Sequence, residues 1–548
     1  MNSDFISRKN FSDLDLEFVF DRLQVVTPYG ETAKKNIQAF LPDELQALKH
    51  ELDLTERVME RLETKRHEIL ELKSLFKEIK QLGRTFDRIE AGETLSVTEL
   101  FEIKHLSLYM EKIRALLVRV QWEKTVGDYM LAPITEVVAL LDPEKTGVST
   151  FYVYNSYSKR LSEIRQTLLE TELAIKKQST EIAKELEGEG FKVSTNGEVK
   201  IRQMDAQRIQ EAKQHPLLSY RMDIPLYSIF RVRPDEGLQK RYDQLLIDQE
   251  NEEYVVRTQL TEKLLDHILQ LRTNVNCIGN IDLSIAKAQF SVAFKCTRPV
   301  FLEAVHEAGQ CIEIQGGRHL KVAYGLEREG KAFTPLDIRI HNSVTLITGA
   351  NMGGKTVSLR MIGQLVALAH MGFHVPCKAI LLYPMSYLFI SVGDSQSIDM
   401  GLSTFGAEIV DIGRVISRKD ETGLVLIDEL ARGTNPKEGF AISKALIEHM
   451  NTGVAQTVIT THYDGLTQTK GVSHYQVNGL SSVDFETIRK EIKAKGMGLL
   501  HEHMDYRLTE VSGDTEIPKE ALRISEMMGL DLGIIHRAKE ILGGSNDE

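Results

Sequence analysis

The sequence has few of the residues that mark secreted, disulfide-bonded or membrane-spanning chains. Among 548 residues there are only 4 cysteines, 13 prolines and 1 tryptophan. Cysteines 277, 296, 311 and 377 lack the close pairs that a zinc site or a redox motif requires, so we expect reduced, mostly buried thiols. There is no apolar run of about 18 residues that could span a bilayer, and no secretion signal at the N-terminus. We therefore expect a cytoplasmic protein with no membrane partner.

Basic charge is also scarce. The chain has 67 Lys and Arg against 79 Asp and Glu, a formal net charge of -12 at pH 7. Proteins contact nucleic-acid phosphates chiefly through clustered Lys and Arg, so this composition does not indicate a nucleic-acid partner. It still permits a local basic surface. The 42% hydrophobic and 27% charged residues are typical of a globular, helix-rich protein. The length predicts three or four domains of about 100–200 residues each.

The first half of the chain is predicted to be helical. Residues 10–130 carry apolar side chains at helical spacing among many charges. A coiled-coil-like stripe runs from Leu161 to Gly188, and a second helical stretch begins near Gly237. Between them, two alternating segments flank Asn196-Gly197, which predicts a tight hairpin. The simplest arrangement is an arm, with one long helix out, a small tip and one long helix back.

The tip of this arm carries several basic residues. If the alternation holds, Lys192, Lys200 and Arg202 share one face of the hairpin. The opposite face is apolar and consists of Phe191, Val193, Val199 and Ile201. A basic face could contact a phosphate backbone, but three charges are also common on any exposed hairpin, where water solvates them. The sequence leaves both interpretations open.

From about residue 344 the chain changes to short β-rich runs followed by helices. Apolar runs at 344–348, 424–427 and 458–461 have the length and composition of buried strands. Buried strands that alternate with helices predict a mostly parallel α/β sheet. The final segment predicts two short helices, at 521–529 and 532–542, with Gly529 ending the first.

The strongest motif lies between an apolar strand and an apolar helix. Residues 349–356 read GANMGGKT and satisfy the pattern G-x-x-x-x-G-K-[ST]. The glycines allow backbone N–H groups to turn inward around phosphates, and the following helix presents its positive end. Lys355 is expected to reach the β and γ oxygens, and the Thr356 hydroxyl to ligate Mg²⁺. The candidate nucleotide-binding residues of this loop are Gly349, Asn351, Gly353, Gly354, Lys355 and Thr356.

Two further runs bring polar side chains to the same edge of the predicted sheet. The strand at 424–427 ends in Asp428 and Glu429, at the carboxyl end where ligands bind in open α/β sheets. Asp428 is expected to hold Mg²⁺, and Glu429 to orient and deprotonate the attacking water. The next run delivers His462, whose imidazole can hydrogen-bond the water or the γ-phosphate. We therefore expect an ATP hydrolase that uses ATP and Mg²⁺, with Glu429 and His462 as catalytic residues.

These three elements resemble the ABC-type ATPase superfamily, and the residues between them indicate a branch. A transporter or SMC-type head would show an L-S-G-G-Q-like signature, whereas this chain has Leu402-Ser403-Thr404-Phe405 after GDSQSI at 393–398. Together with ARGTNPKEG at 431–439 and TTHY at 460–463, this signature resembles the MutS family. The likeness extends to Leu16-Glu17-Phe18 near the start of the chain and to residues 281–299, which resemble the helix before the ATPase domain of that family.

Within the family, the chain looks nearer to the MutS-two branch than to the mismatch-repair sensor. Ala350 stands where the family usually has Pro, and Ala431 where the repair branch has Gly, but neither removes a catalytic group. Neither an N-terminal mismatch-reading domain nor the small C-terminal nuclease domain of that branch is seen in the sequence. The resemblance therefore implies the ATP-driven motor without those two activities.

The resemblance also implies a homodimer with composite sites. Ser403 and Thr404 of one subunit would approach the γ-phosphate held by the other subunit. The implied order is a helical core and lever (1–150), a clamp-like helical arm with a β-hairpin near 190–202 (151–255), the return of the lever (256–320), an ABC-type P-loop α/β ATPase domain (321–480) and a helical dimerisation segment (481–548).

Two functions stay open. In the first, a dimeric clamp related to the ATPases of DNA mismatch repair and recombination encloses branched or duplex DNA between its arms. In the second, an ATP-dependent reactivating factor acts on an adenosylcobalamin-dependent aminomutase, a role known for MutS-like ATPases without the reading and nuclease domains. Family precedent favours the first function and the acidic composition does not.

Overall fold

The computed structural model divides into two compact units. It describes residues 5–233, 235–303, 311–341, 343–349, 354–392, 404–431, 434–463, 465–479, 504–511, 522, 525–526 and 529–544. One unit consists of Met1–Lys77, Val118–Tyr129 and Asn276–Glu548, and the other of Glu78–Leu117 and Met130–Val275. The phosphate-loop motif lies in the first unit and the predicted arm in the second.

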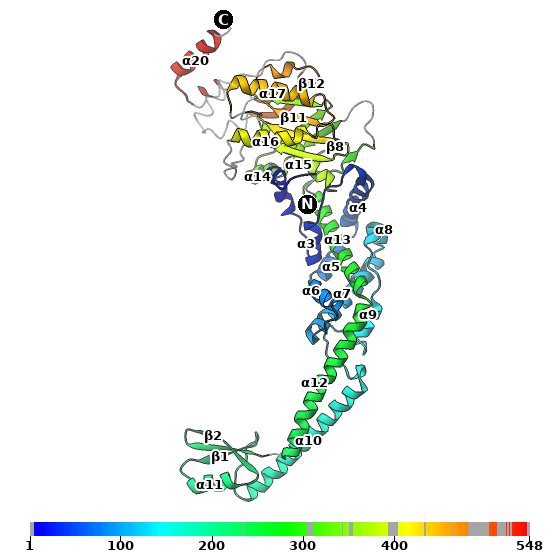
Figure 1. Ribbon diagram of the computed structural model, residues 1–548, viewed down its shortest axis with the longest axis vertical. Coiled ribbons are helices and arrows are strands. Elements are labelled where there is room, and N and C mark those ends of the chain that lie inside the picture. The colour runs from blue at the N-terminus through cyan, green and yellow to red at the C-terminus, as the bar shows by residue number, and fades with distance from the viewer. Residues whose placement is uncertain are drawn as a thin grey trace. The chain divides into compact units, whose positions relative to one another are not determined.

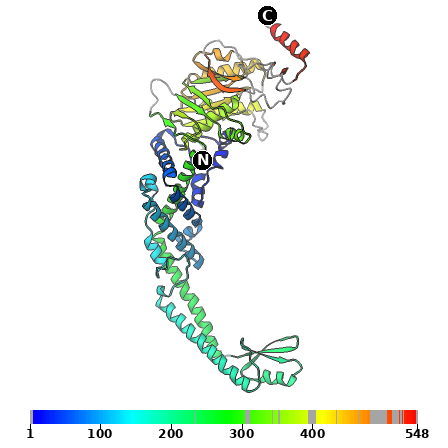
Figure 2. The ribbon, with the colours of Figure 1, turned by 180° about the vertical axis from the view of Figure 1, so that it is seen from behind.

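The second unit contains the two long helices that the sequence predicts. These are α10 (Lys159–Gly188) and α12 (Glu236–Leu265), and they lie side by side in Figures 1 and 2. Each begins at a side-chain cap, because Ser158 accepts a hydrogen bond from the Leu161 N–H and Asp235 accepts one from the Gly237 N–H. The remaining helices of this unit are α6 (Gly83–Glu90), α7 (Val97–Arg119), α9 (Thr135–Leu141), α11 (Ala206–Gln214) and the start of α13 (Ile268–Ala293).

A three-stranded antiparallel sheet lies between α10 and α12 along the chain. Its order is β1-β3-β2, from β1 (Glu198–Arg202), β2 (Leu218–Ile224) and β3 (Tyr227–Val232). One face packs on the end of α10 and on α11 through a buried cluster of Ile182, Leu186, Phe191, Val199, Ile201, Ala212, Leu218, Phe230 and Val232. Lys192, Lys200 and Arg202 are exposed, whereas Val199 and Ile201 are buried, as the alternation predicts.

The predicted hairpin at 190–202 is only partly correct. Its first strand is reduced to a single bridge between Val193 and Val199, and β1 pairs with β3 instead. The backbone N–H of Phe191 donates to the Leu186 carbonyl at 2.8 Å, so the chain entering the turn is tied to the end of α10. Local alternation identified the faces correctly, but the strand partner is set by a segment almost thirty residues further along the chain.

The first unit holds a six-stranded sheet in the order β13-β12-β7-β11-β10-β9. The strands are β7 (Val344–Thr348), β9 (Tyr387–Ser391), β10 (Gly423–Asp428), β11 (Gln456–Thr460), β12 (Val472–Gly479) and β13 (Asp505–Glu510). All neighbouring pairs are parallel except β12 with β13. The mostly parallel sheet predicted from the apolar runs is therefore confirmed.

Helices cover both faces of this sheet. Side chains of α15 (Lys355–His370) pack with Leu424 and Leu426 on one face. Side chains of α16 (Thr404–Ile416) and α17 (Pro436–Met450) pack with Val425 and Ile427 on the other. Because successive side chains of a strand point to opposite faces, the uninterrupted apolar run of β10 is what burial on both faces requires.

A second sheet and more helices complete this unit. The sheet has the order β4-β8-β5-β6, from β4 (Val300–Phe301), β5 (Ile312–Gly317), β6 (Leu336–Ile340) and β8 (Ala379–Leu382). The helices are α1 (Arg8–Asp13), α2 (Leu16–Phe20), α3 (Pro28–Lys35), α4 (Leu45–Thr64), α5 (Arg66–Phe76), α8 (Glu123–Val126), α14 (Leu320–Arg328) and α20 (Leu532–Gly544). In the part of the chain that the structure describes, no helix combines the length and hydropathy needed to cross a bilayer.

The C-terminal region is not purely helical. Helix α20 occupies the segment from Leu532 where a helix is predicted, but β13 also lies between residues 481 and 548 and forms the edge strand beside β12. Its sequence, DYRLTE, places Tyr506 and Leu508 on alternate positions, which suits a strand with one covered face.

Candidate functional site

The predicted site residues meet at one edge of the six-stranded sheet. The neighbouring parallel strands β7, β11 and β10 end next to the phosphate-loop motif, His462 and the Asp428-Glu429 pair, in that order. Asn351, Gly353 and Ser403 lie outside the described residues, and so does the side chain of Thr404, the first residue of α16. The remaining predicted residues can be placed.

The two ends of the phosphate-loop motif have backbone conformations that suit glycine. Gly349 has φ 129° and Gly354 has φ 83°, both in the region that side chains with a Cβ rarely adopt. Space is short as well, because a Cβ on Gly354 would lie 3.1 Å from the Tyr506 ring. Helix α15 begins immediately after Gly354, so the start of the helix lies at the end of the phosphate-loop motif.

Lys355 points back into this loop. Its side chain is only 3% exposed, and its Nζ donates to the Gly349 carbonyl at 2.7 Å and lies 3.6 Å from Glu429 Oε1. A buried ammonium is costly unless it is paired, and here a carbonyl and a carboxylate pair it. A phosphate oxygen could take the place of either partner, since each supplies only a negative or partly negative oxygen.

The carboxylate oxygens of Asp428 and the hydroxyl beside them are ligands of the kind that Mg²⁺ prefers. Its Oδ2 accepts from the Thr356 hydroxyl at 2.7 Å, and its Oδ1 accepts from the Thr460 hydroxyl at 2.6 Å. Hydroxyl and carboxylate oxygens are the usual protein ligands of Mg²⁺, which also keeps several waters and phosphate oxygens. The chemistry of this donor set therefore fits the predicted metal.

Glu429 and His462 lie on short turns after their strands. Glu429 has φ 51°, and its backbone N–H donates to the Thr460 hydroxyl at 2.9 Å. His462 is exposed, and its ring lies against that of Tyr463 at a tilt of 33°, with 4.5 Å between the ring centroids. The Tyr463 hydroxyl donates to the Ala431 carbonyl at 3.4 Å, so it links the turn of His462 to the turn of Glu429.

Glu408 is an acidic residue of this site that the sequence analysis did not predict. It lies on α16 and is half-buried. Burial raises the pKa of Glu408 to about 7, and the nearby charge of Asp428 contributes in the same direction. No local pattern would single out Glu408, because an acidic residue in the first turns of a helix is common.

A cavity of about 720 Å³ opens beside the start of α15. It is lined by the aromatic side chains of Phe333 and Tyr506, by Val322, Leu326, Leu336, Val357 and Met504, and by Glu329, Gly330, Lys331, Ala332, Thr334, Gly354 and Ser358. The sequence analysis missed these lining residues. They come from α14, the segment before β6, α15 and β13, which only the fold brings together.

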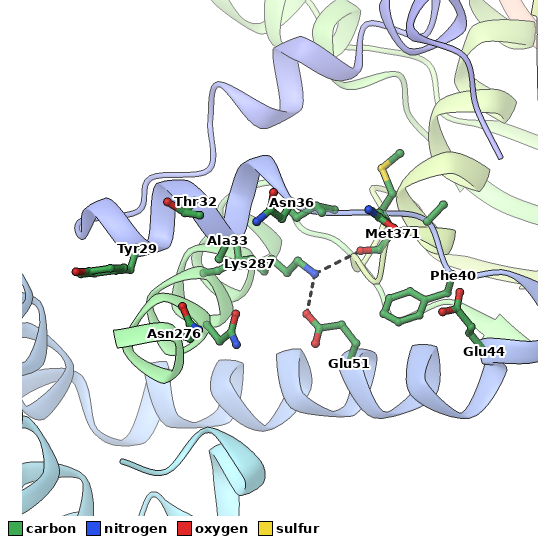
Figure 3. Close-up of a pocket in the computed structure, with 15 residues that line it drawn as sticks. Tyr29, Thr32, Ala33, Asn36, Phe40, Glu44, Glu51, Asn276, Lys287 and Met371 are labelled. Atoms are coloured by element: carbon green, nitrogen blue, oxygen red, sulfur yellow. Dashed lines mark hydrogen bonds and ion pairs between the residues drawn. The ribbon is translucent and has the colours of Figure 1, made fainter. Parts of the chain in front are cut away.

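The other end of α15 is held by a buried ion pair (Figure 3). The Lys287 ammonium, on α13, lies 2.7 Å from Glu51 Oε1 on α4 and donates to the carbonyls of Met371 and Gly372 at 3.3 Å each. These are the first carbonyls after α15, which a positive charge stabilises. The pair borders a second cavity, of about 570 Å³, whose rim includes Tyr29, Asn36, Glu44, Asn276 and Asn280.

Fold and site together define an α/β domain with a phosphate-loop motif whose lysine, acidic pair and threonine meet at the carboxyl edge of a parallel sheet. Residues 345–543 match the model of the family described as MutS domain V. Curated relatives named Endonuclease MutS2 match a larger part of the chain. The domain that residues 345–543 form belongs to the MutS family, and the chain is similar to MutS2 proteins beyond that domain.

Three of these relatives show the extent of the likeness. The protein of Halothermothrix orenii is 30% identical over 314 residues, 56% of this chain and 36% of its own length. That of Geobacillus sp. is 26% identical over 501 residues, 85% of this chain and 58% of its own length. That of Symbiobacterium thermophilum is 33% identical over 276 residues, half of this chain and 31% of its own length. This chain thus spans from about a third to under three fifths of these relatives.

Proposed function

We propose that this protein binds and hydrolyses ATP at the carboxyl edge of the six-stranded sheet. The observation that carries the proposal is the set of contacts among Lys355, Glu429, Asp428 and Thr356, which come from the end of β10 and the start of α15. Ser403, Thr404 and the residues between Gly349 and Gly354 complete the proposed site by family likeness. An ABC-type dimer, with Ser403 and Thr404 acting on the partner's γ-phosphate, is part of this proposal.

Each residue has a separate task in the proposed reaction. Lys355 supplies positive charge to the β and γ oxygens in a buried setting where that charge is poorly screened. Thr356 and Asp428 hold Mg²⁺, which neutralises phosphate charge when it is bound. Glu429 accepts a proton from the attacking water, and His462 hydrogen-bonds the water or the γ-phosphate. The turn after β10 keeps the carboxylate of Glu429 beside the lysine.

The cavity beside α15 is a suitable place for the nucleoside part of ATP. Its volume of about 720 Å³ lies in the usual range of ligand pockets, and two aromatic side chains, Phe333 and Tyr506, line it. Gly354 also lines this cavity, so the cavity reaches the end of the phosphate-loop motif. A purine could pack between apolar and aromatic side chains there while its phosphates extend to the start of α15.

DNA, branched or duplex, is the proposed partner, and its support is the charge of the arm tip. Residues 190–233 hold eight Lys and Arg against four Asp and Glu, although the whole chain carries a net charge of -12. On the sheet face away from the buried cluster, Lys200, Arg202 and Arg231 are exposed. A basic face on an acidic protein is the electrostatic feature that phosphate contacts require. The aminomutase alternative gains no support from the described residues, so we do not propose it.

Two substitutions test the ATPase proposal. Lys355→Ala should abolish ATP hydrolysis, because the γ-phosphate loses its main counter-charge. Glu429→Gln should still bind ATP but hydrolyse it at least ~100-fold more slowly, which is the usual contribution of a general base. Phosphate release and nucleotide binding, measured on the same preparations, separate the two effects. Unchanged turnover in Lys355→Ala would rule out this site, whereas near-wild-type turnover in Glu429→Gln would point to His462 as the base.

A further inference from the structure

The turn between β2 and β3 of the arm tip contains a leucine where the backbone favours glycine. Ile224 pairs with Tyr227, so Pro225 and Leu226 form a two-residue turn. Leu226 has φ 76°, in the left-handed region where Gly and Asn are the residues usually found. Its side chain is 72% exposed. Neither the backbone conformation nor packing within the arm tip accounts for a leucine at this position.

A second exposed apolar side chain lies beside this turn. Met204 is 94% exposed and follows Gln203, whose backbone N–H donates to the Leu226 carbonyl at 3.0 Å. The side-chain amide of Gln203 donates to the Ile224 carbonyl at 3.2 Å. On the other side of Met204, the Asp205 side chain caps α11. The backbone around Met204 is therefore fixed next to the turn, and we call Met204 and Leu226 the apolar pair.

The apolar pair borders the basic face of the sheet, whose strands β1 and β2 are labelled in Figure 1. Arg202 lies opposite Tyr227 in the ladder, one residue from the turn. Lys200 and Arg231 are exposed on the same face. Within residues 190–233, all of which the structure describes, these three side chains form no salt bridge, whereas two of the four acidic residues are paired with other arginines. Free positive charge beside exposed apolar side chains is complementary to DNA, which presents phosphates next to apolar base faces.

We propose that Leu226 and Met204 insert between DNA bases where stacking is interrupted, while Lys200 and Arg202 bind the neighbouring phosphates. This inference rests on the proposed DNA partner and names the part of the DNA that the arm tip contacts. Inserted apolar side chains unstack a base step at a cost that contact with the base faces repays. The turn presents the leucine before DNA binds, so little ordering is lost on binding. A second copy of this chain fits less well, because two basic faces repel each other.

The test compares the wild-type protein with Met204→Ala/Leu226→Gly on two duplexes of one sequence, one intact and one nicked at its centre. A base step at a nick opens at lower cost, so insertion is favoured there. The wild-type protein should bind the nicked duplex about 5- to 10-fold more tightly than the intact one, and the variant less than about twofold more tightly. The salt slope of the variant should match that of the wild-type protein, because the phosphate contacts remain.

Two further measurements keep this test specific. A fluorescent adenine analogue beside the nick should brighten when the wild-type protein unstacks it, and should not brighten with the variant. The matched control is Leu169→Ala/Leu173→Ala, which removes two exposed leucines from α10 in the same unit and should keep the preference for the nick. Because glycine suits φ 76°, Leu226→Gly should not lower the unfolding temperature. A lower temperature would assign the leucine a structural role and overturn the inference.

The binding outcomes separate this inference from the proposed partner. Absence of DNA binding by the wild-type protein at low ionic strength overturns both. Equal wild-type binding to the two duplexes, or an unchanged preference in the double variant, overturns the insertion alone. An equal loss on both duplexes with a flatter salt slope would mean that the apolar pair only supports the basic face, which also overturns it. Self-association that the double variant loses, with DNA binding unchanged, would assign the apolar pair to a contact between copies instead.

Discussion

At the scale of single residues, buried histidines show how the fold sets chemistry that composition does not reveal. His370 lies at the end of α15, stacks on Phe5 with 4.8 Å between ring centroids, and is fully buried. The Met385 N–H donates to its Nε2, so Nδ1 carries the proton and donates to the Val366 carbonyl. Burial lowers the pKa of His370 to about 4. The ring is therefore neutral, and it makes one hydrogen bond as donor and one as acceptor.

We predict that stability falls as the pH drops from about 6.5 to about 4. Burial lowers the pKa of His319 and His374 to about 4 as well. Over that interval the unfolded chain binds protons on these histidines and the folded chain does not, so each contributes up to about 1.4 kcal/mol per pH unit. The stability that these neutral histidines provide is fully present above the unfolded-state pKa of about 6.5. It is lost as the pH falls toward their folded-state pKa of about 4.

Denaturation by urea at several pH values measures this effect. His370→Gln removes one of the titrating groups, so its unfolding free energy should fall less steeply between pH 6.5 and 4.5 than that of the wild-type protein. Equal slopes for the two proteins would contradict the assignment of His370 as a buried neutral group.

At the scale of elements, α15 depends on both of its ends. Its first turn follows the phosphate-loop motif, and the first carbonyls after its last turn accept hydrogen bonds from Lys287, which is paired with Glu51. Gly372, just after the helix, has φ 72°, and a Cβ there would lie 2.6 Å from the Glu51 side chain. The ion pair and the glycine together fix where the helix stops, and thereby support the position of Lys355 at the other end of the same helix.

We predict that Lys287→Met destabilises the protein by about 3 kcal/mol, the usual cost of breaking a buried ion pair. Much of that cost is the charge left on Glu51, so the double variant Lys287→Met/Glu51→Gln should be more stable than Lys287→Met alone. Chemical denaturation of the wild-type, single and double variants gives the coupling energy directly. A double variant that loses the sum of the two single effects would mean that the pair is not coupled.

The whole molecule combines an acidic chain with a basic arm tip. We predict that the proposed DNA binding depends on this tip, and that changing Lys192, Lys200 and Arg202 to Ala flattens its salt dependence by up to about 0.9 in logarithmic slope per lost phosphate contact. Titrations with duplex and branched DNA at several salt concentrations measure the slope.

A control with the same change of charge uses the exposed residues Lys35, Arg66 and Lys77, which lie in the other unit. Replacing these three by Ala should leave the slope near that of the wild-type protein. If the wild-type protein shows no DNA binding even at low ionic strength, where charges are least screened, the clamp role is excluded.

The sequence alone determined the type of most elements and the sheet edge at which the proposed ATP site lies. The long helices α10 and α12 follow from apolar periodicity, which is a local property of the chain. The meeting of Lys355, Asp428 and His462 at one sheet edge also follows from sequence, because the carboxyl ends of parallel strands share an edge.

Only the tertiary structure decided which distant segments meet. It made β3 the partner of β1, added β13 to the edge of the main sheet, and brought Lys287 to the end of α15. None of these pairings has a local signature, because backbone groups and charges can be satisfied by many alternative partners along the chain. The choice among those partners depends on how the whole core packs, and that is information no short stretch of sequence contains.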